Sequence, residues 1–511
     1  MKRDNVRIKY HPILDFKRDG KIIFRFNGRP VSAYAGETVA AALYASGIRI
    51  FSRSMKYHRP RGLFCLSGHC SHCLMRIDGI PNVPACRTLA DDDMTVESQN
   101  AWPSLKFDVA NLVDKLAGWL RPGFYYRYFI RPRWLYHIWE RFLRKAAGIG
   151  KLPDSPVTHV PVKRKQASPQ VVVVGAGVAG MNAALHALNT GATVWLIEKE
   201  NKLGGRWSYD TRPFDTPDKF PKKYAHELVT ELSEKLRQQQ HCHVLKNTVA
   251  FAWYEEGVLA AIRSGEFWEF EPQCTIIATG GYETPAVFEN NDLPGIFLAG
   301  GIQRLMHGDG ILPGKRAVIV TNYNEGYIVA KQLHEAGVSV AAVVDSRMSR
   351  ESDSCLEREY ITHKGGTLFF SHEIKSAIGR SFVKGAVLKS LGTSSENHQK
   401  NEVKIMCDTI CIAGFRSPAN DLLFQHGCNG TYTLSCPEHY IRKPDLNTHM
   451  AVSDGLYVAG EASGSHGIKQ AYLEGKLAGL TAANHLGFGN HATEAQIKNT
   501  ENELKSLRQE L

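Results

Sequence analysis

The stretch from residue 170 to residue 200 constrains the fold more than any other part of this sequence. Four consecutive valines, Val171–Val174, predict a fully buried strand of the kind found in parallel sheets. A glycine turn and a stretch rich in helix formers follow, and a second apolar strand is expected at Ala192–Ile197. We therefore expect a βαβ unit within a nucleotide-binding sheet.

The turn of this unit has the spacing Gly175-x-Gly177-x-x-Gly180, and the second strand ends at Glu198. The second glycine lets the backbone approach a pyrophosphate, which sits on the unpaired N–H groups at the start of the helix. The carboxylate is placed to accept hydrogen bonds from a ribose hydroxyl. An ordinary glycine turn is the alternative, but strand, helix, second strand and acid together favour a dinucleotide. The residues predicted to bind it here are Gly175, Gly177, Val178, Ala179, Gly180, Glu198 and Lys199.

Three later segments are expected to complete this site. A glycine pair at 204–205 precedes Arg206, and a buried strand from Cys274 ends in another glycine pair. Glycines at such points let the backbone pass close to a cofactor. The segment Asp454–Glu461 predicts a strand that ends in a glycine and an acid. We predict that the cofactor, FAD or another dinucleotide such as NAD, also contacts Gly205, Arg206, Thr279, Gly280, Gly281, Gly460 and Glu461.

The length and composition indicate a multidomain protein. The chain has 511 residues, of which 43% are hydrophobic, so it can bury several cores. No apolar run follows the charged N-terminus, and no stretch of 18 uninterrupted apolar residues occurs. We therefore expect a cytoplasmic protein without a signal peptide or a transmembrane segment.

Basic residues are concentrated in the N-terminal third. Residues 1–170 contain 29 Lys and Arg against 13 Asp and Glu, a balance of +16, and the remaining 33 and 38 give −5. Such a surface favours an acidic partner, a bound anion or an anionic membrane face. No nucleic-acid-binding motif accompanies the charge, so we do not expect a nucleic acid partner.

Four of the eleven cysteines cluster within a short stretch. Their order, Cys65-x4-Cys70-x2-Cys73-x12-Cys86, is the ligand spacing of plant-type [2Fe–2S] domains. Backbone N–H groups of such a loop point at the sulfurs and offset the negative charge of the cluster. A zinc site with four thiolates and purely structural thiols are the alternatives. We interpret His69 and His72 as polar loop residues beside the cluster.

The cysteine stretch lies within an expected β-grasp unit. Lys21–Phe26 and Arg29–Tyr34 predict two strands, and Asn27-Gly28 between them is a strong hairpin signal. Thr38–Ser46 is rich in helix formers and stops before a glycine. We therefore predict a small sheet with one helix that carries the metal loop.

The segment after this unit is aromatic and basic. Between Trp102 and Phe142, twelve aromatic residues alternate with arginines, and residues 163–169 predict a linker. One interpretation is a partner-binding or interfacial segment, which leaves peripheral membrane contact open. The other is a pair of interdomain helices, and the prolines at 122 and 132 and the glycine at 123 favour this second interpretation. The arginines are Arg121, Arg127, Arg131, Arg133 and Arg141.

A second nucleotide-type unit is expected from residue 315. Arg316–Val320 predicts a strand, Gly326–Ala336 a helix, and Val338–Val344 a strand that ends at Asp345. The glycine pattern is lost, because Thr321-x-Tyr323-x-x-Gly326 stands in its place. A fold can outlast its binding site, so nicotinamide binding is not expected here.

These patterns predict an α/β chain with nested nucleotide-binding domains. In order, we expect a [2Fe–2S] β-grasp domain at 1–100, a helical linker at 101–168, a first part of the FAD-binding domain at 169–300, a degenerate NAD-binding-like domain at 301–420, a second part of the FAD-binding domain at 421–490 and a polar, helical tail at 491–511.

Two sets of motifs carry a resemblance to known families. GAGVAG, the ATGG segment and DGLYVAGE resemble the two-dinucleotide-binding-domain flavoproteins, although those proteins have Gly-Asp where this chain has Gly460-Glu461. Four longer segments resemble the sarcosine oxidase alpha-subunit group, which includes opine oxidase, hydroxyproline dehydrogenase and hydrogen cyanide synthase subunits. They are SMKYHRPRG, FYYRYF, ATGGYETPAVFENNDLPGIFLAGG and LPGKRAVIVTNYNEGYIVAKQL. The aminomethyltransferase-like half of sarcosine oxidase alpha has no counterpart in these 511 residues.

The resemblance implies a heteromeric flavoenzyme. It implies a beta subunit of amino-acid-oxidase type, a small amine or imino-acid substrate, an FMN site shared between subunits, and a separate electron acceptor. The chain would then pass electrons between a flavin and the [2Fe–2S] cluster. The alternatives are a stand-alone NAD(P)H-dependent reductase and a non-enzymatic redox sensor or scaffold. No catalytic acid or base is assigned, and we interpret His466 as a loop histidine.

Overall fold

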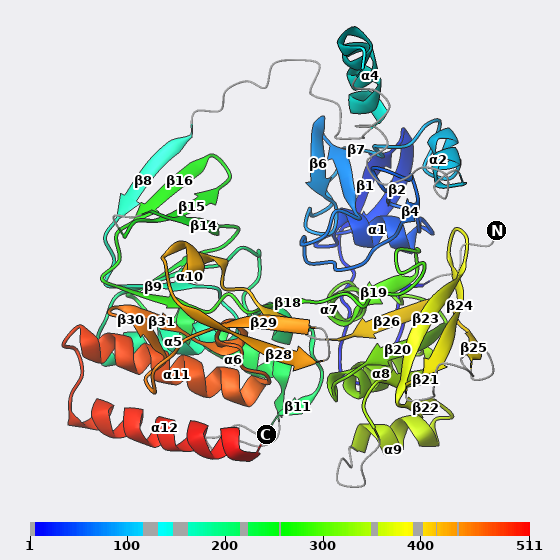
Figure 1. The fold of residues 1–511 in the computed structure, drawn as a ribbon. Helices are drawn as coiled ribbons and strands as arrows, with labels where there is room; N and C mark the ends of the chain where they lie inside the picture. Colours follow the sequence, from blue (N-terminus) through cyan, green and yellow to red (C-terminus); the bar gives the residue numbers. More distant parts are fainter. Residues whose placement is uncertain are drawn as a thin grey trace. The chain divides into compact units, whose positions relative to one another are not determined.

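The computed structural model describes residues 6–115, 131–146, 162–214, 223–254, 257–348, 356–391, 402–414, 416–436 and 439–510. The chain divides into two compact units (Figure 1). Unit 1 comprises Met1–Val157 and Pro285–Gly414, and unit 2 comprises Thr158–Thr284 and Phe415–Leu511. None of the described helices is both long and apolar enough to cross a membrane. The predicted domain boundaries at 100, 168, 300, 420 and 490 stay predictions.

The N-terminal part of unit 1 is a five-stranded sheet with one helix. The strand order is β2–β1–β7–β5–β6. The expected hairpin is confirmed, because β1 and β2 pair antiparallel around Asn27 and Gly28, both with positive φ. The expected helix is also confirmed, and the Thr38 side chain caps it by accepting from the Ala41 N–H at 3.2 Å. The elements are β1 (Lys21–Phe26), β2 (Arg29–Tyr34), α1 (Val39–Ala45), β5 (Leu74–Ile77), β6 (Ile80–Pro84) and β7 (Thr95–Glu97).

The rest of unit 1 is built on a parallel sheet of order β19–β26–β20–β21–β22. Its strands are almost wholly apolar, as expected for strands covered on both faces. A three-stranded antiparallel sheet of β23, β24 and β25 accompanies it. The strands are β19 (Ile296–Leu298), β20 (Arg316–Thr321), β21 (Ser339–Asp345), β22 (Thr367–Phe370), β23 (His372–Gly379), β24 (Val383–Ser390), β25 (Val403–Met406) and β26 (Thr409–Ala413). The helices are α7 (Ala299–Gln303), α8 (Glu325–Glu335) and α9 (Leu356–His363).

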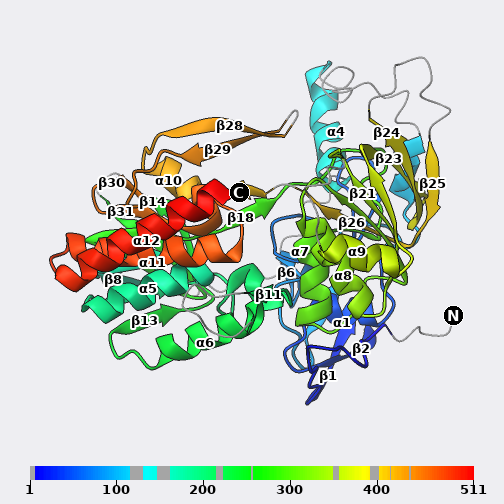
Figure 2. The same cartoon turned by 90° about the horizontal axis from the view of Figure 1, so that it is seen from below.

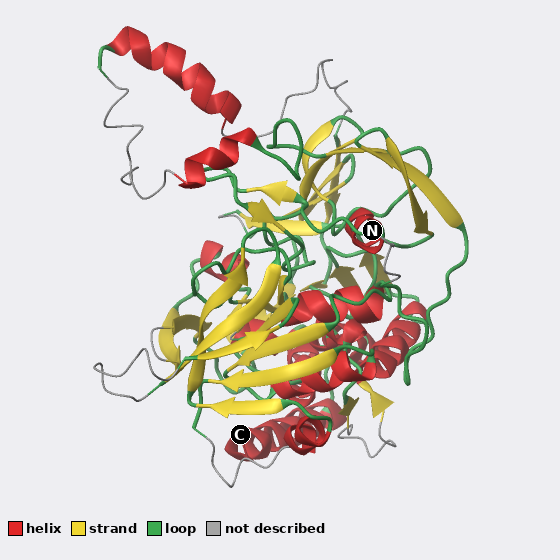
Figure 3. Cartoon of the chain, turned by 90° about the vertical axis from the view of Figure 1, so that its right-hand side faces the viewer, coloured by secondary structure: helices red, strands yellow, loops and turns green. Residues whose placement is uncertain are grey.

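Short strands precede the cysteine loop, and two helices lie in the aromatic segment. They are β3 (Ser52–Arg53), β4 (Pro60–Arg61), α2 (Leu112–Lys115) and α4 (Arg133–Ala146). Arg121, Arg127 and the FYYRYF motif lie outside the described residues. Figure 3 shows the helices in red, with α4 as the long helix at the upper left, and the strands in yellow.

Unit 2 is organised around a six-stranded sheet of order β13–β10–β9–β17–β31–β30. All neighbours are parallel except β30 and β31. The strands are β9 (Val171–Val174), β10 (Val194–Ile197), β13 (Cys242–Leu245), β17 (Cys274–Ile277), β30 (Ala451–Ser453) and β31 (Leu456–Val458). The helices are α5 (Val178–Thr190), α6 (Ala225–Arg237), α11 (Ile468–His485) and α12 (His491–Glu510). The tail is therefore helical, as predicted.

Small residues let the helices of unit 2 pack closely. Cβ atoms added at Gly475 and Gly479 of α11 would lie 2.1 and 2.2 Å from the carbonyl oxygens of Ala179 and Ala183 of α5. The backbones of the two helices are therefore in direct contact. Figures 1 and 2 both show α11 between α5 and α12. This packing fixes the start of α5, where the predicted glycine turn lies.

One prediction for unit 2 is wrong. The segment expected to be a linker contains the strand β8 (Lys163–Ala167), which pairs parallel to β16 (Glu266–Phe270). The Lys165 ammonium lies 2.6 Å from a Glu266 carboxylate oxygen and over the Trp268 ring. Charged side chains on an edge strand gave this segment the composition of a loop. The sheet continues through β15 (Leu259–Arg263) to β14 (Val249–Trp253).

Candidate functional site

The four clustered cysteines form two pairs in unit 1. The Sγ atoms of Cys65 and Cys70 lie 3.2 Å apart, and the thiols of Cys73 and Cys86 hydrogen-bond to each other. A tetrahedral zinc site needs its ligands around one point. In the described part of the chain, no three His, Cys, Asp or Glu side chains converge in that way. Two pairs of thiols fit two bridged irons better than they fit one zinc ion.

The backbone of the cysteine loop turns its N–H groups toward the sulfurs. The Ser67 N–H points at the Cys65 sulfur at 3.5 Å, and the Gly68 N–H bonds to the Cys86 sulfur. Leu66 and Gly68 adopt positive φ to make this turn. Donors of this kind stabilise negative charge on the thiolates, and the hydrogen bond from Cys70 lowers the pKa of Cys65 to about 5. The loop can therefore hold an anionic cluster.

His72 lies beside this loop and is kept neutral. Its Nε2 lies 3.1 Å from the Arg61 guanidinium, and its ring lies 5.0 Å from the Phe64 ring. Burial, with Arg61 second, lowers the pKa of His72 to about 4. A neutral ring wedged between an arginine and a phenylalanine fits the predicted role of a structural loop residue.

The predicted dinucleotide turn follows β9 in unit 2, and its glycines have separate steric roles. Gly175 has φ +99°, and a Cβ there would lie 2.3 Å from the Ala278 carbonyl oxygen. A Cβ on Gly180 would lie 1.8 Å from the Gly175 carbonyl oxygen. Gly177 caps α5 with an ordinary φ of −70°, and nothing lies within 4 Å of its missing Cβ. The first and third glycines are thus required by packing, whereas the second leaves open space for a ligand. Val178 and Ala179, the first residues of α5, are buried, and backbone N–H groups at the start of a helix have no partner within it.

Glu198 braces the turn from the end of β10. One carboxylate oxygen accepts from the Ala176 N–H at 2.7 Å and the other from the Glu200 N–H at 2.8 Å. Burial raises the pKa of Glu198, while these two N–H groups and the charge of Lys199 act in the opposite direction. A cavity of about 510 Å³ lies near the segment after Glu198. Its lining includes Asn201, Lys202, Leu203 and Lys246.

The other predicted cofactor residues of unit 2 converge on this turn. The Gly204 N–H donates to the Ala176 carbonyl at 2.7 Å, and a Cβ on Gly205 would lie 3.5 Å from the Gly177 Cα. A Cβ on Gly460, at φ +73°, would lie 2.9 Å from the Ala179 Cβ. Gly280 has φ +79° and open space, whereas the Thr279 hydroxyl donates to the Ala419 carbonyl.

Glu461 is neutralised by two arginines. Its carboxylate lies 2.6 Å from the Arg206 guanidinium and 3.5 Å from that of Arg416. Arg416 was not predicted, because it lies 210 positions after Arg206 in a segment without a motif. A Cβ on Gly281 would lie 3.3 Å from a Glu461 oxygen. The Glu461 carboxylate therefore packs against the glycine pair at 280–281. The roles of these residues in binding stay predictions.

Glu474 and Arg508 form a second support that the sequence pattern does not indicate. Glu474 is fully buried in α11, and its carboxylate accepts from the Gly460 N–H and the Ser463 hydroxyl, both at 2.9 Å. The Arg508 guanidinium of α12 lies 3.0 Å from the other carboxylate oxygen. The C-terminal helix thus reaches the Gly460 turn through one buried carboxylate. A lone glutamate in an apolar helix was the only signal.

His466 lies beside the Glu461 cluster. Burial lowers its pKa, and the charges of Lys443, Arg206 and Arg416 lower it further, although Glu461 raises it. The ring is therefore neutral near pH 7. Neither its position nor its charge assigns it a proton-transfer role.

The corresponding turn of unit 1 is filled by its own side chains. Asp345, at the end of β21, is fully buried and accepts from the Tyr327 hydroxyl at 2.8 Å. The Arg347 guanidinium also lies 2.7 Å from Asp345. The Thr321 hydroxyl donates within the turn, and a Cβ on Gly326 would lie 2.4 Å from the Thr321 side chain. A carboxylate with these partners cannot also accept from a ribose.

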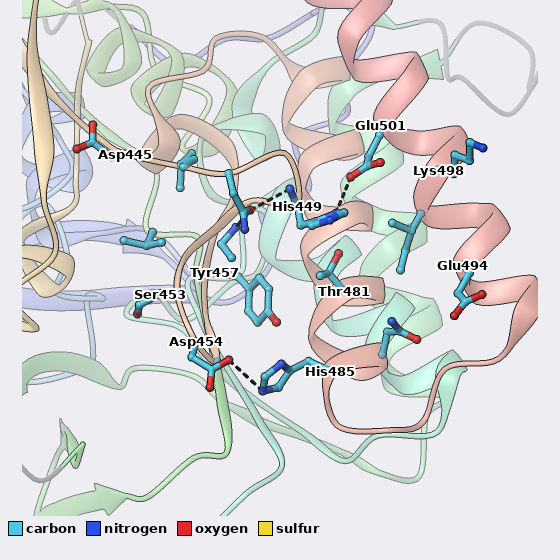
Figure 4. Close-up of a pocket in the computed structure, with 17 residues that line it drawn as sticks. Asp445, His449, Ser453, Asp454, Tyr457, Thr481, His485, Glu494, Lys498 and Glu501 are labelled. Atoms are coloured by element: carbon cyan, nitrogen blue, oxygen red, sulfur yellow. Dashed lines mark hydrogen bonds and ion pairs between the residues drawn. The ribbon is translucent and has the colours of Figure 1, made fainter.

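A cavity of about 1030 Å³ lies elsewhere in unit 2, at the amino end of β31. Figure 4 shows it between the β30–β31 hairpin, α11 and α12. His449 pairs with Glu501 at 2.6 Å, and His485 lies 3.6 Å from Asp454. Dinucleotides bind at the carboxyl ends of parallel strands, which is the opposite end of this sheet. We assign no ligand to this cavity.

Two family models match the chain. The model described as "2Fe-2S iron-sulfur cluster binding domain" matches residues 19–101. The model described as "FAD dependent oxidoreductase" matches residues 170–269. These are the cysteine-loop region and the glycine-turn region, and they support FAD and a [2Fe–2S] cluster as the cofactors.

Curated relatives are subunits of oxidases and of a synthase. The alpha subunit of sarcosine oxidase from Rhizobium meliloti (strain 1021) is 30% identical over 501 residues, which are 92% of this chain and 46% of that protein. The A subunit of opine oxidase from Agrobacterium tumefaciens (strain Ach5) is 25% identical over 61% of this chain and 65% of its own. The HcnB subunit of hydrogen cyanide synthase from Pseudomonas protegens is 23% identical, over 66% of this chain and 75% of that subunit. This chain spans less than half of the sarcosine oxidase alpha subunits that it matches.

Solved structures share the fold. L-proline dehydrogenase from P. horikoshii has a TM-score of 0.67 at 20% identity. The match includes 96% of this chain and 79% of the dehydrogenase chain. Thioredoxin reductase from T. acidophilum has a TM-score of 0.50 at 18% identity over 62% of this chain and 97% of its own. The predicted two-dinucleotide-binding-domain fold with an N-terminal [2Fe–2S] domain is confirmed.

The chain is therefore a homologue of the sarcosine oxidase alpha, opine oxidase A and HcnB subunits. It is an FAD-dependent oxidoreductase with a [2Fe–2S] domain. The predicted resemblance and the two predicted cofactors are confirmed.

Proposed function

We propose that this chain is the electron-transfer subunit of a heteromeric dehydrogenase or oxidase that acts on the CH–NH group of a small amine or imino acid. The carrying observation is that one chain combines paired thiols on a donor-rich loop with an open dinucleotide turn. The names of its relatives, sarcosine oxidase and opine oxidase, support the substrate class. The word "subunit" in those names supports a heteromer.

The residues of the chain would hold the two cofactors. The N–H groups at the start of α5 would bind the pyrophosphate over Gly177, and Glu198 would accept from a ribose. The Cys65–Cys70 pair would ligate one iron, and the Cys73–Cys86 pair the other. When bound, FAD takes up an electron pair and the cluster transfers single electrons. The fixed N–H groups around the sulfurs would favour the reduced, more negative cluster.

Substrate oxidation is assigned to a partner. We propose a beta subunit of amino-acid-oxidase type, an FMN site shared with it, and a cytoplasmic location. Oxidation of a secondary amine to an imine removes two electrons and two protons; a flavin would take up both electrons with one proton, and a base in the partner would take up the other proton. Glu461 is already bound by two arginines, so this chain offers no free base at that point.

The NAD(P)H-reductase alternative has less support. It requires nicotinamide binding in unit 1, where Tyr327 and Arg347 occupy Asp345. The redox sensor or scaffold alternative requires the absence of turnover. Both alternatives make predictions opposite to ours in one assay.

The test uses the native complex, purified with its co-purifying subunits. We expect a secondary amine from the set sarcosine, proline and an opine to bleach the flavin, reduce a dye and give the low-temperature EPR signal of a reduced [2Fe–2S] cluster. NADH should do none of these. Rapid bleaching of the isolated chain by NADH would favour the reductase, and no turnover with any of these amines would favour the sensor.

A cysteine variant with a matched control separates the two cofactors. Cys70→Ser should remove the visible [2Fe–2S] absorbance, leave the FAD bound, and stop electron transfer to one-electron acceptors. Cys242→Ser, a change in an isolated thiol of unit 2, should keep all three properties. Unchanged cluster absorbance in Cys70→Ser would show that the ligand assignment is wrong.

A further inference from the structure

α4 presents large apolar side chains to solvent. Trp134 and Ile138 lie one turn apart on it, and their exposed fractions are 66% and 62%. Apolar side chains that lie side by side on one exposed face mark an interaction site more often than singly exposed ones do. We therefore expect a partner surface to cover this face of the helix.

The polar side of α4 is basic. Its fourteen residues include four basic residues and one acidic residue, which gives a balance of +3. Arg133 and Arg141 are exposed, and neither has an acidic partner in the described ranges. Arg141 follows Ile138 by three positions and Trp134 by seven, so it shares the face of the apolar pair, whereas Arg133 lies on the neighbouring polar side of the helix. The surface that covers α4 should therefore combine an apolar layer with negative charge.

We propose that α4 docks on the surface of an anionic lipid bilayer and lies in its headgroup region without crossing it. A helix of fourteen residues is about 21 Å long, which suits a helix parallel to the surface. Tryptophan and arginine are the residues that prefer this interface, with the ring in the acyl boundary and the guanidinium on the headgroups. The net charge of +16 in residues 1–170 adds attraction over a wider area. A partner subunit would need an acidic, apolar groove for the same face and is the competing occupant.

The sequence left two interpretations of this segment, an interdomain helix pair and an interfacial segment. The exposure of Trp134 and Ile138 within unit 1 supports the interfacial interpretation, and the interdomain one stays a prediction.

Vesicle co-sedimentation of the native complex tests the proposal. The complex should bind vesicles of phosphatidylcholine and phosphatidylglycerol, bind pure phosphatidylcholine at least tenfold less, and detach as salt increases. Trp134→Ser with Ile138→Ser should reduce binding to the anionic vesicles by about tenfold or more. Arg133→Glu with Arg141→Glu should remove the preference for anionic vesicles.

A matched control uses exposed apolar residues elsewhere in unit 1. Val287→Ser with Met348→Ser changes side chains that are 94% and 71% exposed, and vesicle binding should be unchanged. Amine-dependent dye reduction in solution should also be unchanged in every variant, so failure here is separable from failure of the proposed function. Absence of binding to anionic vesicles, or release of a co-purifying subunit by Trp134→Ser with Ile138→Ser, would overturn the proposal.

Discussion

Unit 1 and unit 2 each contain a parallel, nucleotide-type sheet, and the two differ at the turn after the first strand. In unit 2, the space over Gly177 is open, and Glu198 braces the turn through backbone N–H groups. In unit 1, Thr321 fills the turn, and Asp345 is bound by a tyrosine and an arginine. Both turns join a buried strand to a helix in the same way.

The comparison separates the requirements of the fold from those of binding. Burial of apolar strands and close packing of one helix are satisfied in both units. Binding requires in addition an empty space over the turn and a carboxylate with unused acceptor capacity. Unit 1 has lost both and has gained internal hydrogen bonds, so its turn now stabilises the fold.

The largest expected effect comes from Gly177→Ala. The backbone at this position suits alanine, and no atom of the chain lies near the new methyl group. The apo-protein should therefore keep its thermal midpoint. The methyl group would occupy the pyrophosphate space and cost about 3 kcal/mol of binding energy, or about 100-fold in FAD affinity. The loss of affinity is measured by the FAD content after purification and by flavin fluorescence titration.

The equivalent position in unit 1 supplies the control for that variant. Tyr323→Ala should leave FAD content unchanged, because the turn of unit 1 holds no dinucleotide. Full FAD retention by Gly177→Ala would mean that the pyrophosphate does not bind over Gly177. The proposed difference between the turns of the two units would then be wrong.

The next effect is on stability and belongs to unit 1. Asp345→Asn weakens the contacts to Tyr327 and Arg347, and it should lower the free energy of unfolding by about 2 kcal/mol without changing FAD content. Chemical denaturation measures it, and Asp454→Asn, at a solvent-exposed carboxylate, should have no effect. A loss of NADH binding in Asp345→Asn would mean that Asp345 still serves a nucleotide site.

A smaller effect is expected at the support of the Gly460 turn. Arg508→Ala leaves the buried Glu474 without its guanidinium partner and should weaken FAD binding by about tenfold, equivalent to about 1.4 kcal/mol. Arg508→Lys should restore most of the affinity. Lys505→Ala, an exposed position on the same helix, should bind FAD normally. An Arg508→Ala protein with normal affinity would show that α12 does not influence the site.

The smallest effect is the pH dependence of FAD binding. Burial raises the pKa of Glu198 in the chain without cofactor. Ribose hydroxyls donate to the ionised carboxylate, so binding favours the deprotonated form. Affinity should therefore increase as pH rises through the pKa of Glu198 and decrease as pH falls, by less than about tenfold. Glu198→Gln should abolish this dependence in titrations across the stable pH range; an unchanged slope would exclude Glu198 as the ribose acceptor.

Local patterns predicted most of the fold. The valine run, the Asn27-Gly28 turn and the Thr38 cap each act within a few residues, so their signals survive in the sequence. The four thiol ligands were also predicted from their spacing, although Cys86 reaches Cys73 only across the β5–β6 hairpin. Charge misled the prediction at β8, because an exposed edge strand carries the same polar residues as a linker.

The supports of the site could not be predicted. Arg416 contacts Glu461, and Arg508 contacts Glu474, across long separations in the sequence. Such ion pairs depend on which helices become neighbours, and no periodicity encodes that. The loss of the glycine pattern in unit 1 was visible, whereas its replacement by the Asp345 contacts was not.

The contact between Glu474 and Arg508 gives the chain an order of maturation. The glycine turn leaves the ribosome first, and Arg508 follows 333 residues after Gly175. At bacterial or eukaryotic elongation rates this is a delay of roughly 20 to 70 seconds. During that time the nascent turn has no clamp, so cofactor loading is expected to follow the synthesis of α12. A protease that cuts before α12 would return the mature flavoprotein to the same unclamped condition.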